Sequence, residues 1–317
     1  MKKSRPLNFV CFLISFVPAA SPAEFSLKDD GTVLTVLDNE KPVLCYNYGR
    51  VDPPAGIDKD RWWRSCYIHP LYGLDGDVLT QDYPPDHLHH RGVYWAWPKC
   101  QIGERAADIW VHKDIRQRFL HWTTKQAGAG RAEIEVANAW VFSDDPEPYV
   151  IEEVRFVVRP ADERGRAIDV RLRFTNRGQE PVSFLGAAGK GYGGFCFRPD
   201  ATRKDPVIST ELGVRKKDAL KINTRWADFS SRISPNGPYS GVAIFQHPEN
   251  PGYPHSGWIL RYYGFLGASW PHLETVVLNP SESVELRYRL YIHRGTAQQA
   301  RVAESHREFI KSATSNE

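Results

Sequence analysis

Hydrophobic and polar residues alternate with a period of two over several long stretches of the chain. In Ile168–Thr175 every second residue is apolar and the residues between are charged or polar, and Val284–His293 follows much the same pattern. Strict alternation over this length is typical of half-buried antiparallel strands. Shorter segments that also predict strands are Thr32–Leu37, Val43–Tyr48, Ala132–Phe142, Val150–Val158, Gly241–Phe245 and Trp258–Tyr262.

Turn-forming residues separate these segments, which favours short connections between neighbouring strands. Only the tail, from about Thr296 to Ser312, has the composition and spacing of a helix. No internal repeat or low-complexity linker divides the chain. The pattern therefore predicts an all-β fold, a large antiparallel two-sheet sandwich with a short C-terminal helix, in a single domain covering residues 24–317. The turn sequences are Asp30-Gly31, Asp75-Gly76, Asn176–Gly178 and Pro235–Gly237.

The first 23 of the 317 residues follow a different pattern. A positive start containing Lys2 and Arg5 precedes an apolar run, Leu7–Val17, that is too short to span a bilayer comfortably. Small residues at Ser21 and Ala23 then fit the cleavage site of a signal peptide. We expect cleavage after Ala23 and export to the periplasm or the extracellular space. No other long apolar run is present, so we expect no membrane span in the mature protein.

Removing this leader changes the charge balance. The full chain has 41 Lys and Arg against 38 Asp and Glu, and the three basic residues of the leader reduce the first number to 38. A mature protein without net charge lacks the electrostatic signature of binding to nucleic acid or to an anionic membrane. We therefore expect no nucleic-acid partner.

Four cysteines remain after the leader: Cys45, Cys66, Cys100 and Cys196. Their spacing matches neither a redox CxxC motif nor a zinc site. Export permits disulfides, and the four thiols allow three pairings between which the sequence does not choose. The alternative is that all four are small buried apolar residues.

The stretch YPPDHLHHRGVYWAW, residues 83–97, concentrates polar chemistry beside aromatic surface. Two prolines at its start predict an extended or turn-like backbone. If it is extended, His87, His89 and Arg91 project to one side, and Asp86 and His90 project to the other. His87 and His89 are then candidate ligands for Zn, Mn or Fe. A third ligand would come from His247, His272, Asp86 or Glu274.

Two interpretations of the same stretch need no metal. A neutral histidine can act as general acid or base, with Asp86 orienting it and Arg91 binding a substrate oxygen. Alternatively the cluster is a polar turn whose side chains satisfy backbone groups. The fixed spacing of HExxH is absent, so the cluster marks a site more strongly than it marks a metal.

The chain is rich in aromatic residues, with 10 Trp and 14 Tyr. Some of them belong in the core of a large sandwich, but aromatic walls with a few polar groups are also typical of ligand pockets, here for a carbohydrate. For two of the candidates an alternative to ligand binding remains: Arg198 could form a surface ion pair, and Asp228 could cap a turn. The candidate substrate-binding residues are Arg91, Trp95, Tyr192, Arg198, Trp226, Asp228, His247 and His272.

The same stretch resembles the PPDHPHHR-type signature of an uncharacterised family of exported bacterial proteins labelled PmoA-like, or "methane oxygenase PmoA". Leu88 stands where that family usually has proline. The resemblance implies a galactose-mutarotase-like supersandwich and a setting among carbohydrate-degrading proteins, whereas the label implies a copper oxygenase. Further matching pieces are GYGGFCFRP (191–199), RWADFS (225–230) and RYYGFLGASWPH (261–272).

The leading hypothesis is an exported carbohydrate-active enzyme that carries out proton transfer, elimination or hydrolysis on a sugar or an oxidised keto sugar. Its candidate catalytic residues are His87, His89, His90 and Asp86, and we expect His89→Ala to abolish turnover. The alternative is a non-catalytic carbohydrate-binding protein. A metal-dependent oxygenase is the third hypothesis.

Overall fold

The structure is a computed structural model that describes residues 22–314. The predicted signal peptide, residues 1–23, lies outside this range except for its last two residues. Within 22–314 we find no helix with both the length and the apolar character needed to cross a membrane.

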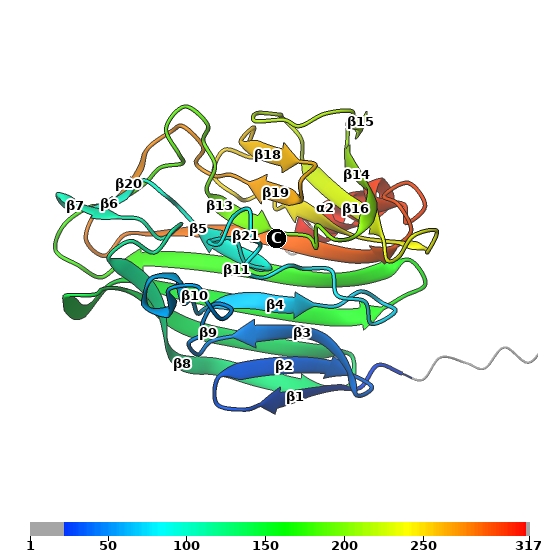
Figure 1. The fold of residues 1–317 in the computed structure, drawn as a ribbon, viewed down its shortest axis with the longest axis horizontal. Helices are drawn as coiled ribbons and strands as arrows, with labels where there is room; N and C mark the ends of the chain where they lie inside the picture. The colour runs from blue at the N-terminus through cyan, green and yellow to red at the C-terminus, as the bar shows by residue number, and fades with distance from the viewer. Residues whose placement is uncertain (1–21, 315–317) are drawn as a thin grey trace, which may run out of the picture.

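Two large sheets and one small sheet make up the fold (Figure 1). The eight-stranded sheet has the order β1 (Phe25–Asp29), β2 (Val33–Asp38), β3 (Lys41–Asn47), β4 (Tyr67–Leu71), β5 (Val93–Ala96), β13 (Gly194–Phe197), β19 (Phe265–Ala268) and β18 (Trp258–Arg261). The nine-stranded sheet has the order β15 (Gly213–Val214), β14 (Lys204–Thr210), β16 (Trp226–Arg232), β17 (Tyr239–Gln246), β21 (Ser283–Arg294), β11 (Gly165–Asn176), β10 (Asp145–Ala161), β9 (Arg131–Phe142) and β8 (Ile115–Gly128). The small sheet contains β20 (Val276–Leu278), β12 (Val182–Phe184), β6 (Cys100–Ile102) and β7 (Arg105–Ala107).

The alternating segments form the centre of the nine-stranded sheet. Strand β11 pairs antiparallel with β10 on one side and with β21 on the other. Its apolar residues, from Ile168 to Phe174, are buried, and most of the residues between them are partly exposed. The end of β21 departs from the pattern, because Tyr291 and His293 are buried although they lie on the face whose earlier residues are charged. The predicted all-β antiparallel class is confirmed.

Two helices accompany the sheets. The predicted C-terminal helix is confirmed as α2 (Val302–Thr314), and a one-turn helix, α1 (Lys59–Trp62), was not expected. Helix α2 begins later than predicted because residues 297–301 form turns. It buries Val302 and Phe309, and Phe309 packs against Phe245 of β17. The helix therefore covers part of the nine-stranded sheet.

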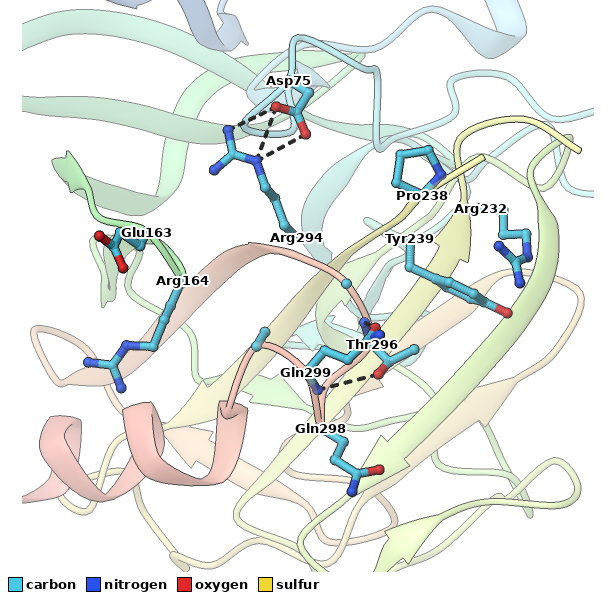
Figure 2. Close-up of a pocket in the computed structure, with 12 residues that line it drawn as sticks. Asp75, Glu163, Arg164, Arg232, Pro238, Tyr239, Arg294, Thr296, Gln298 and Gln299 are labelled. Carbon is cyan, nitrogen blue, oxygen red and sulfur yellow. Dashed lines mark hydrogen bonds and ion pairs between the residues drawn. The ribbon is translucent and has the colours of Figure 1, made fainter. Parts of the chain in front are cut away.

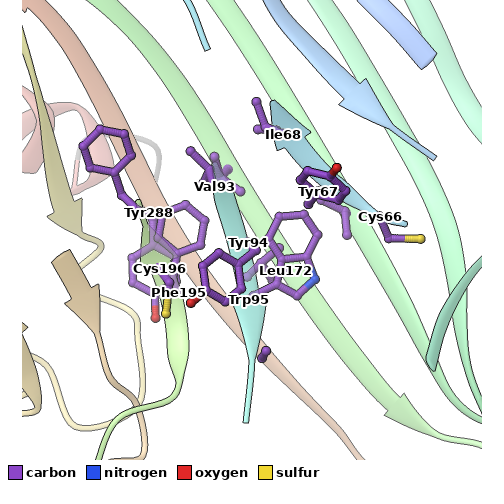
Figure 3. Close-up of a cluster of buried hydrophobic side chains, with 14 of the residues drawn as sticks. Cys66, Tyr67, Ile68, Val93, Tyr94, Trp95, Leu172, Phe195, Cys196 and Tyr288 are labelled. Atoms are coloured by element: carbon purple, nitrogen blue, oxygen red, sulfur yellow. The ribbon is translucent and has the colours of Figure 1, made fainter. Parts of the chain in front are cut away.

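The main core lies between the two large sheets. Trp95 of β5 contacts Phe156 of β10, and Phe195 of β13 stacks on Tyr288 of β21 with ring centroids 4.5 Å apart (Figure 3). Because side chains alternate along a strand, the neighbours of these residues, such as Tyr94, project from the outer face of the eight-stranded sheet. That outer face carries the site described below.

The four cysteines that follow the predicted leader, Cys45, Cys66, Cys100 and Cys196, are free thiols, and all are buried. Burial raises the pKa of the Cys45 and Cys100 thiols above the ordinary value. The sequence left open disulfide pairing and four buried free cysteines, and the structure contains the second arrangement.

Candidate functional site

The histidine stretch folds as two consecutive turns. The amide of His87 donates to the carbonyl oxygen of Pro84 at 3.0 Å, and the amide of His90 donates to that of His87 at 2.8 Å. The backbone is thus turn-like, one of the two predicted conformations, and the arrangement expected for an extended segment, with His90 facing away from His87 and His89, does not form. The turns bring all three imidazoles to the wall of one cavity.

The three imidazoles pack closely. The ring of His87 lies between His90 and Tyr263, nearly parallel to both, with centroid distances of 4.6 Å and 5.0 Å. His89 meets the ring of His90 edge-on at 4.6 Å. His87 and His89 remain partly exposed, whereas His90 is buried beneath them on Phe265. Only the first two imidazoles can therefore touch a ligand.

The cavity has a volume of about 300 Å³. Its floor is the outer face of β18 and β19, where Ile259, Arg261 and Phe265 share one side of the sheet by register. The loop before β13 adds Lys190 and Tyr192. The complete lining is His87, His89, His90, Trp110, Lys190, Tyr192, Asp218, Ile259, Arg261, Tyr263 and Phe265.

A carboxylate orients His87. Asp86 Oδ2 lies 2.9 Å from His87 Nδ1, and Asp86 Oδ1 accepts a 2.8 Å hydrogen bond from the buried guanidinium of Arg198. Although burial works in the opposite direction, the hydrogen bonds from His87 and Arg198 lower the pKa of the Asp86 carboxyl. Asp86 is therefore a fixed anion that holds Nδ1–H of His87, so Nε2 is the ring nitrogen free to exchange a proton.

His89 and His90 have a different electrostatic setting. Burial, together with the neighbouring charges of His87, Arg64, Arg91 and Arg198, lowers the pKa of His89 to about 3. Burial also lowers the pKa of His90 well below its ordinary value. Both imidazoles are therefore neutral at physiological pH.

Arg91 and Trp95 do not line the cavity. The guanidinium of Arg91 is buried, donates to the carbonyl oxygens of Leu88 and His90, and lies 3.4 Å from Asp82. It satisfies the carbonyls that the turns leave free, rather than a substrate oxygen. Trp95 was predicted to stack on a sugar, but its position in the strand directs it into the core between the sheets, where it is fully buried.

Four other predicted ligand-binding residues also lie elsewhere. Trp226 belongs to a small cluster under α2, and Asp228 is fully buried 2.7 Å from His293 Nε2. The turn-cap alternative for Asp228 is wrong too, since it sits within β16. His247 borders a groove on the nine-stranded sheet. His272 is buried outside the cavity lining, with Nε2 3.3 Å from the carbonyl oxygen of Leu220.

Of the substrate-binding candidates, only Tyr192 lines the cavity. Arg198 lies behind it, and neither of its predicted roles fits, because its ion pair with Asp86 is buried on the arginine side. In the stretch GYGGFCFRP, a glycine at position 191 permits close packing. A Cβ on Gly191 would lie 2.2 Å from the imidazole of His272, and the residue has a φ of +72°.

His87 and His89, the predicted metal pair, lie next to each other in the cavity wall. His87 and His89 have ring centroids 5.6 Å apart, and Nδ1 of His87 already faces Asp86. Among residues 22–314, no three His, Cys, Asp or Glu side chains are grouped so that they could hold a metal ion.

Sequence reasoning missed several residues that line the cavity. Arg261, Tyr263 and Phe265 lie in RYYGFLGASWPH, which was noted as a motif, but none of these three residues was named as a candidate. Trp110 lies in the segment that follows the aromatic run. Arg261, Tyr263 and Phe265 could have been identified as candidates because they belong to a piece of sequence that matches the family resemblance.

A larger hollow of about 680 Å³ lies elsewhere, beside β17 and the turn that precedes α2 (Figure 2). Its arginines already have acidic partners: Arg294 binds Asp75, and Arg232 binds Asp205. It has one aromatic ring, Tyr239, and contains none of the predicted site residues. We therefore take the histidine-lined cavity as the candidate site.

Comparison with solved structures returns proteins of low sequence identity. The GH36 α-galactosidase AgaA from Geobacillus stearothermophilus is 11% identical, with a TM-score of 0.41 over 86% of this chain. The heparan sulfate lyase HepC from Pedobacter heparinus is 11% identical, with a TM-score of 0.36 over 88% of the chain. A galactose mutarotase-like protein from Lactobacillus casei is 7% identical, with a TM-score of 0.37 over 85% of the chain and 100% of its own length.

The chain spans only 41% of the galactosidase and 36% of the lyase. TM-scores of this size carry no inference about activity. No curated protein sequence matches the chain. The resemblance to the PmoA-like family finds no support among these comparisons. Residues 33–307 match a family profile described only as a family of unknown function, and because this match covers most of the sequence, the chain belongs to the family DUF6807.

Proposed function

We propose that the protein is a carbohydrate-active enzyme that moves a proton on a sugar, with the Asp86–His87 pair as its acid–base group. The observation that carries this proposal is that His87, held by Asp86, lies at the wall of an aromatic-lined cavity. Its volume of about 300 Å³ is at the lower end of ligand pockets, which span roughly 300–1,000 Å³, and suits a ligand of sugar size.

The walls of the cavity supply both kinds of contact that a sugar needs. Tyr192 and Tyr263, which are half-buried and exposed respectively, offer ring surface for the C–H faces, and Asp218 and Arg261 offer hydrogen bonds to hydroxyl groups. These side chains come from distant parts of the sequence, so the fold holds them in place before a ligand arrives.

The proposed chemistry uses His87 as the group that exchanges the proton. Asp86 accepts from Nδ1–H and stabilises the imidazolium that forms when Nε2 takes a proton from the substrate. Lys190 and Arg261 provide positive charge for an oxyanion that develops next to the reacting carbon. Because His89 is neutral, its part is a hydrogen bond to the ligand rather than proton donation.

The experiment uses purified protein and a panel of hexoses, hexuronic acids and keto sugars in D₂O. Proton NMR reports deuterium uptake at carbon, which reveals proton transfer, and also new signals from elimination or hydrolysis. We expect His87→Ala to lower the rate by about 10² to 10⁴-fold, the usual contribution of general acid–base catalysis. His121→Ala, at an exposed histidine of β8, is the matched control and should keep the rate.

Three outcomes would change the assignment. Full activity of His87→Ala would remove the Asp86–His87 pair from the reaction. Binding of a sugar by the native protein without deuterium uptake or products would make the protein a carbohydrate-binding protein. Oxygen consumption with a bound transition metal would favour the oxygenase alternative.

We also propose export, with removal of residues 1–23. The carbonyl oxygen of Glu24 accepts from Asn39, and Glu24 forms a β-bridge with Ala129, so cleavage after Ala23 leaves these contacts intact. It removes two hydrogen bonds, from the amide of Gly130 to the carbonyl oxygen of Ala23 and from the side-chain amide of Asn39 to the carbonyl oxygen of Pro22. Mass spectrometry of the protein secreted by its host should give Glu24 as the first residue, and an intact leader would overturn the proposal.

A further inference from the structure

Positive charge exceeds negative charge around the cavity. Lys190, Arg261 and Asp218 line it, and the other charged groups lie directly behind the histidines. Three ion pairs account for most of them: Arg261–Asp218 at 3.4 Å, Arg198–Asp86 at 2.8 Å and Arg91–Asp82 at 3.4 Å. Two cations, Lys190 and Arg64, have no carboxylate partner among residues 22–314.

Arg64 is the stronger of these two observations because it is buried. Its guanidinium donates only to neutral oxygens, the carbonyls of His89 and Trp110 at 3.3 Å and 3.4 Å and the side chain of Gln117 at 3.5 Å. Its Nε has no hydrogen-bond partner in the described part of the chain. A buried cation without a counter-ion is costly, and burial lowers its pKa to about 10.

The position of Arg64 connects this charge to the site. It holds the backbone of His89 and Trp110, which both line the cavity, and its guanidinium lies over the ring of Tyr94. The charge therefore acts on the cavity at short range from below, while Lys190 acts from the rim. The imidazoles of His89 and His90 do not add to the positive charge because they are neutral.

From this imbalance we infer that the ligand is an acidic sugar, one that carries a carboxylate or a sulfate group. The inference rests on the proposed function, since it names the class of sugar that the same cavity takes. An anion in the cavity would supply the counter-charge that Lys190 and Arg64 lack. The neutral and partly exposed imidazole of His89 could donate a hydrogen bond to it without competing for its charge.

The test compares matched sugars by calorimetry at constant ionic strength: D-glucuronate against D-glucose, D-galacturonate against D-galactose, and glucose 6-sulfate. We expect an acidic member to bind at least about tenfold more tightly than its neutral counterpart, the size of one charge-assisted hydrogen bond. Lys190→Met should reduce that preference. Lys28→Met, at an exposed lysine of β1, should leave it unchanged.

The results separate the inference from the function on which it rests. A preference for the uronates assigns a carboxylate, and a preference for glucose 6-sulfate assigns a sulfate. Equal or tighter binding of the neutral sugars would overturn the acidic-sugar inference and leave the carbohydrate site standing. If no sugar of either kind binds, both proposals fail. A preference for acidic sugars that Lys190→Met does not change would overturn the role of Lys190 in the inference.

Discussion

The neutral state of His89 predicts how the fold responds to acid. In the folded protein, burial and the nearby charges of His87, Arg64, Arg91 and Arg198 lower the pKa of His89 to about 3. In the unfolded chain a histidine has a pKa of about 6.5. Below pH 6.5 the unfolded state therefore binds a proton that the folded state rejects.

The sign and size of the effect follow from this difference. A depressed histidine pKa stabilises the folded state fully above pH 6.5, and this stability is lost as the pH falls toward 3. Each pH unit well inside that window costs about 1.4 kcal/mol for one proton. Between pH 7.5 and pH 5.0, His89 alone should therefore lower the free energy of unfolding by about 2 kcal/mol.

Urea unfolding at pH 7.5, 6.5, 5.5 and 5.0 measures this contribution. His89→Gln replaces the imidazole by a polar side chain that does not titrate, so the variant should lose about 2 kcal/mol less than the native protein over this range. His121→Gln serves as the control, because an exposed histidine should leave the pH dependence unchanged. A different stability at pH 7.5 does not affect the comparison, which uses only the slope.

A His89→Gln variant whose stability falls as steeply with acid as that of the native protein would refute the argument. It would mean that His89 takes up a proton in the folded state near its ordinary pKa. The cavity would then hold an imidazolium, and the proposed neutral hydrogen-bonding role of His89 would be wrong.

Two further predictions concern the core and the metal. Asp228→Ala should lower the free energy of unfolding by about 3–5 kcal/mol, because it leaves the buried side chains of His293 and Ser230 without their hydrogen-bond acceptor. The control Asp205→Ala, at a surface ion pair, should lower it by at most about 1 kcal/mol. Equal effects of the two substitutions in urea unfolding would contradict this reasoning. Protein purified without a histidine tag should show the same sugar turnover before and after dialysis against EDTA, with metal content measured in parallel. Stoichiometric metal that is lost in His87→Ala, together with loss of turnover on dialysis, would instead make His87 a ligand.

The sequence predicted the strands well where one face of a strand is buried. The alternation of Ile168–Thr175 and Val284–His293 identified β11 and β21, because a period of two is a local property of an extended chain. The edge strand β8 was missed, since much of it is exposed and lacks a regular apolar face. The sequence also singled out the histidines that line the candidate cavity, because residues 86–90 concentrate titratable side chains in one short segment.

The sequence did not determine which of these side chains face the cavity. Asp86, His87, His89 and His90 were identified as candidates, but their directions depend on turns whose hydrogen bonds form between backbone groups. Trp95 was a candidate for stacking on a ligand. It lies in the core because side chains alternate along β5 and that of Trp95 points toward the nine-stranded sheet.

The rest of the site depends on long-range pairing. Arg261 and Phe265 reach the histidines because β19 pairs with β13 and β13 pairs with β5, which brings together segments more than 160 residues apart. The unpaired charge of Arg64 likewise becomes visible only when burial and partners are known. The local pattern of apolar and polar residues thus determined much of the secondary structure and the position of the histidine cluster in the chain. Tertiary packing decided the direction of each side chain and the charge of the cavity, because both depend on neighbours that the sequence does not place.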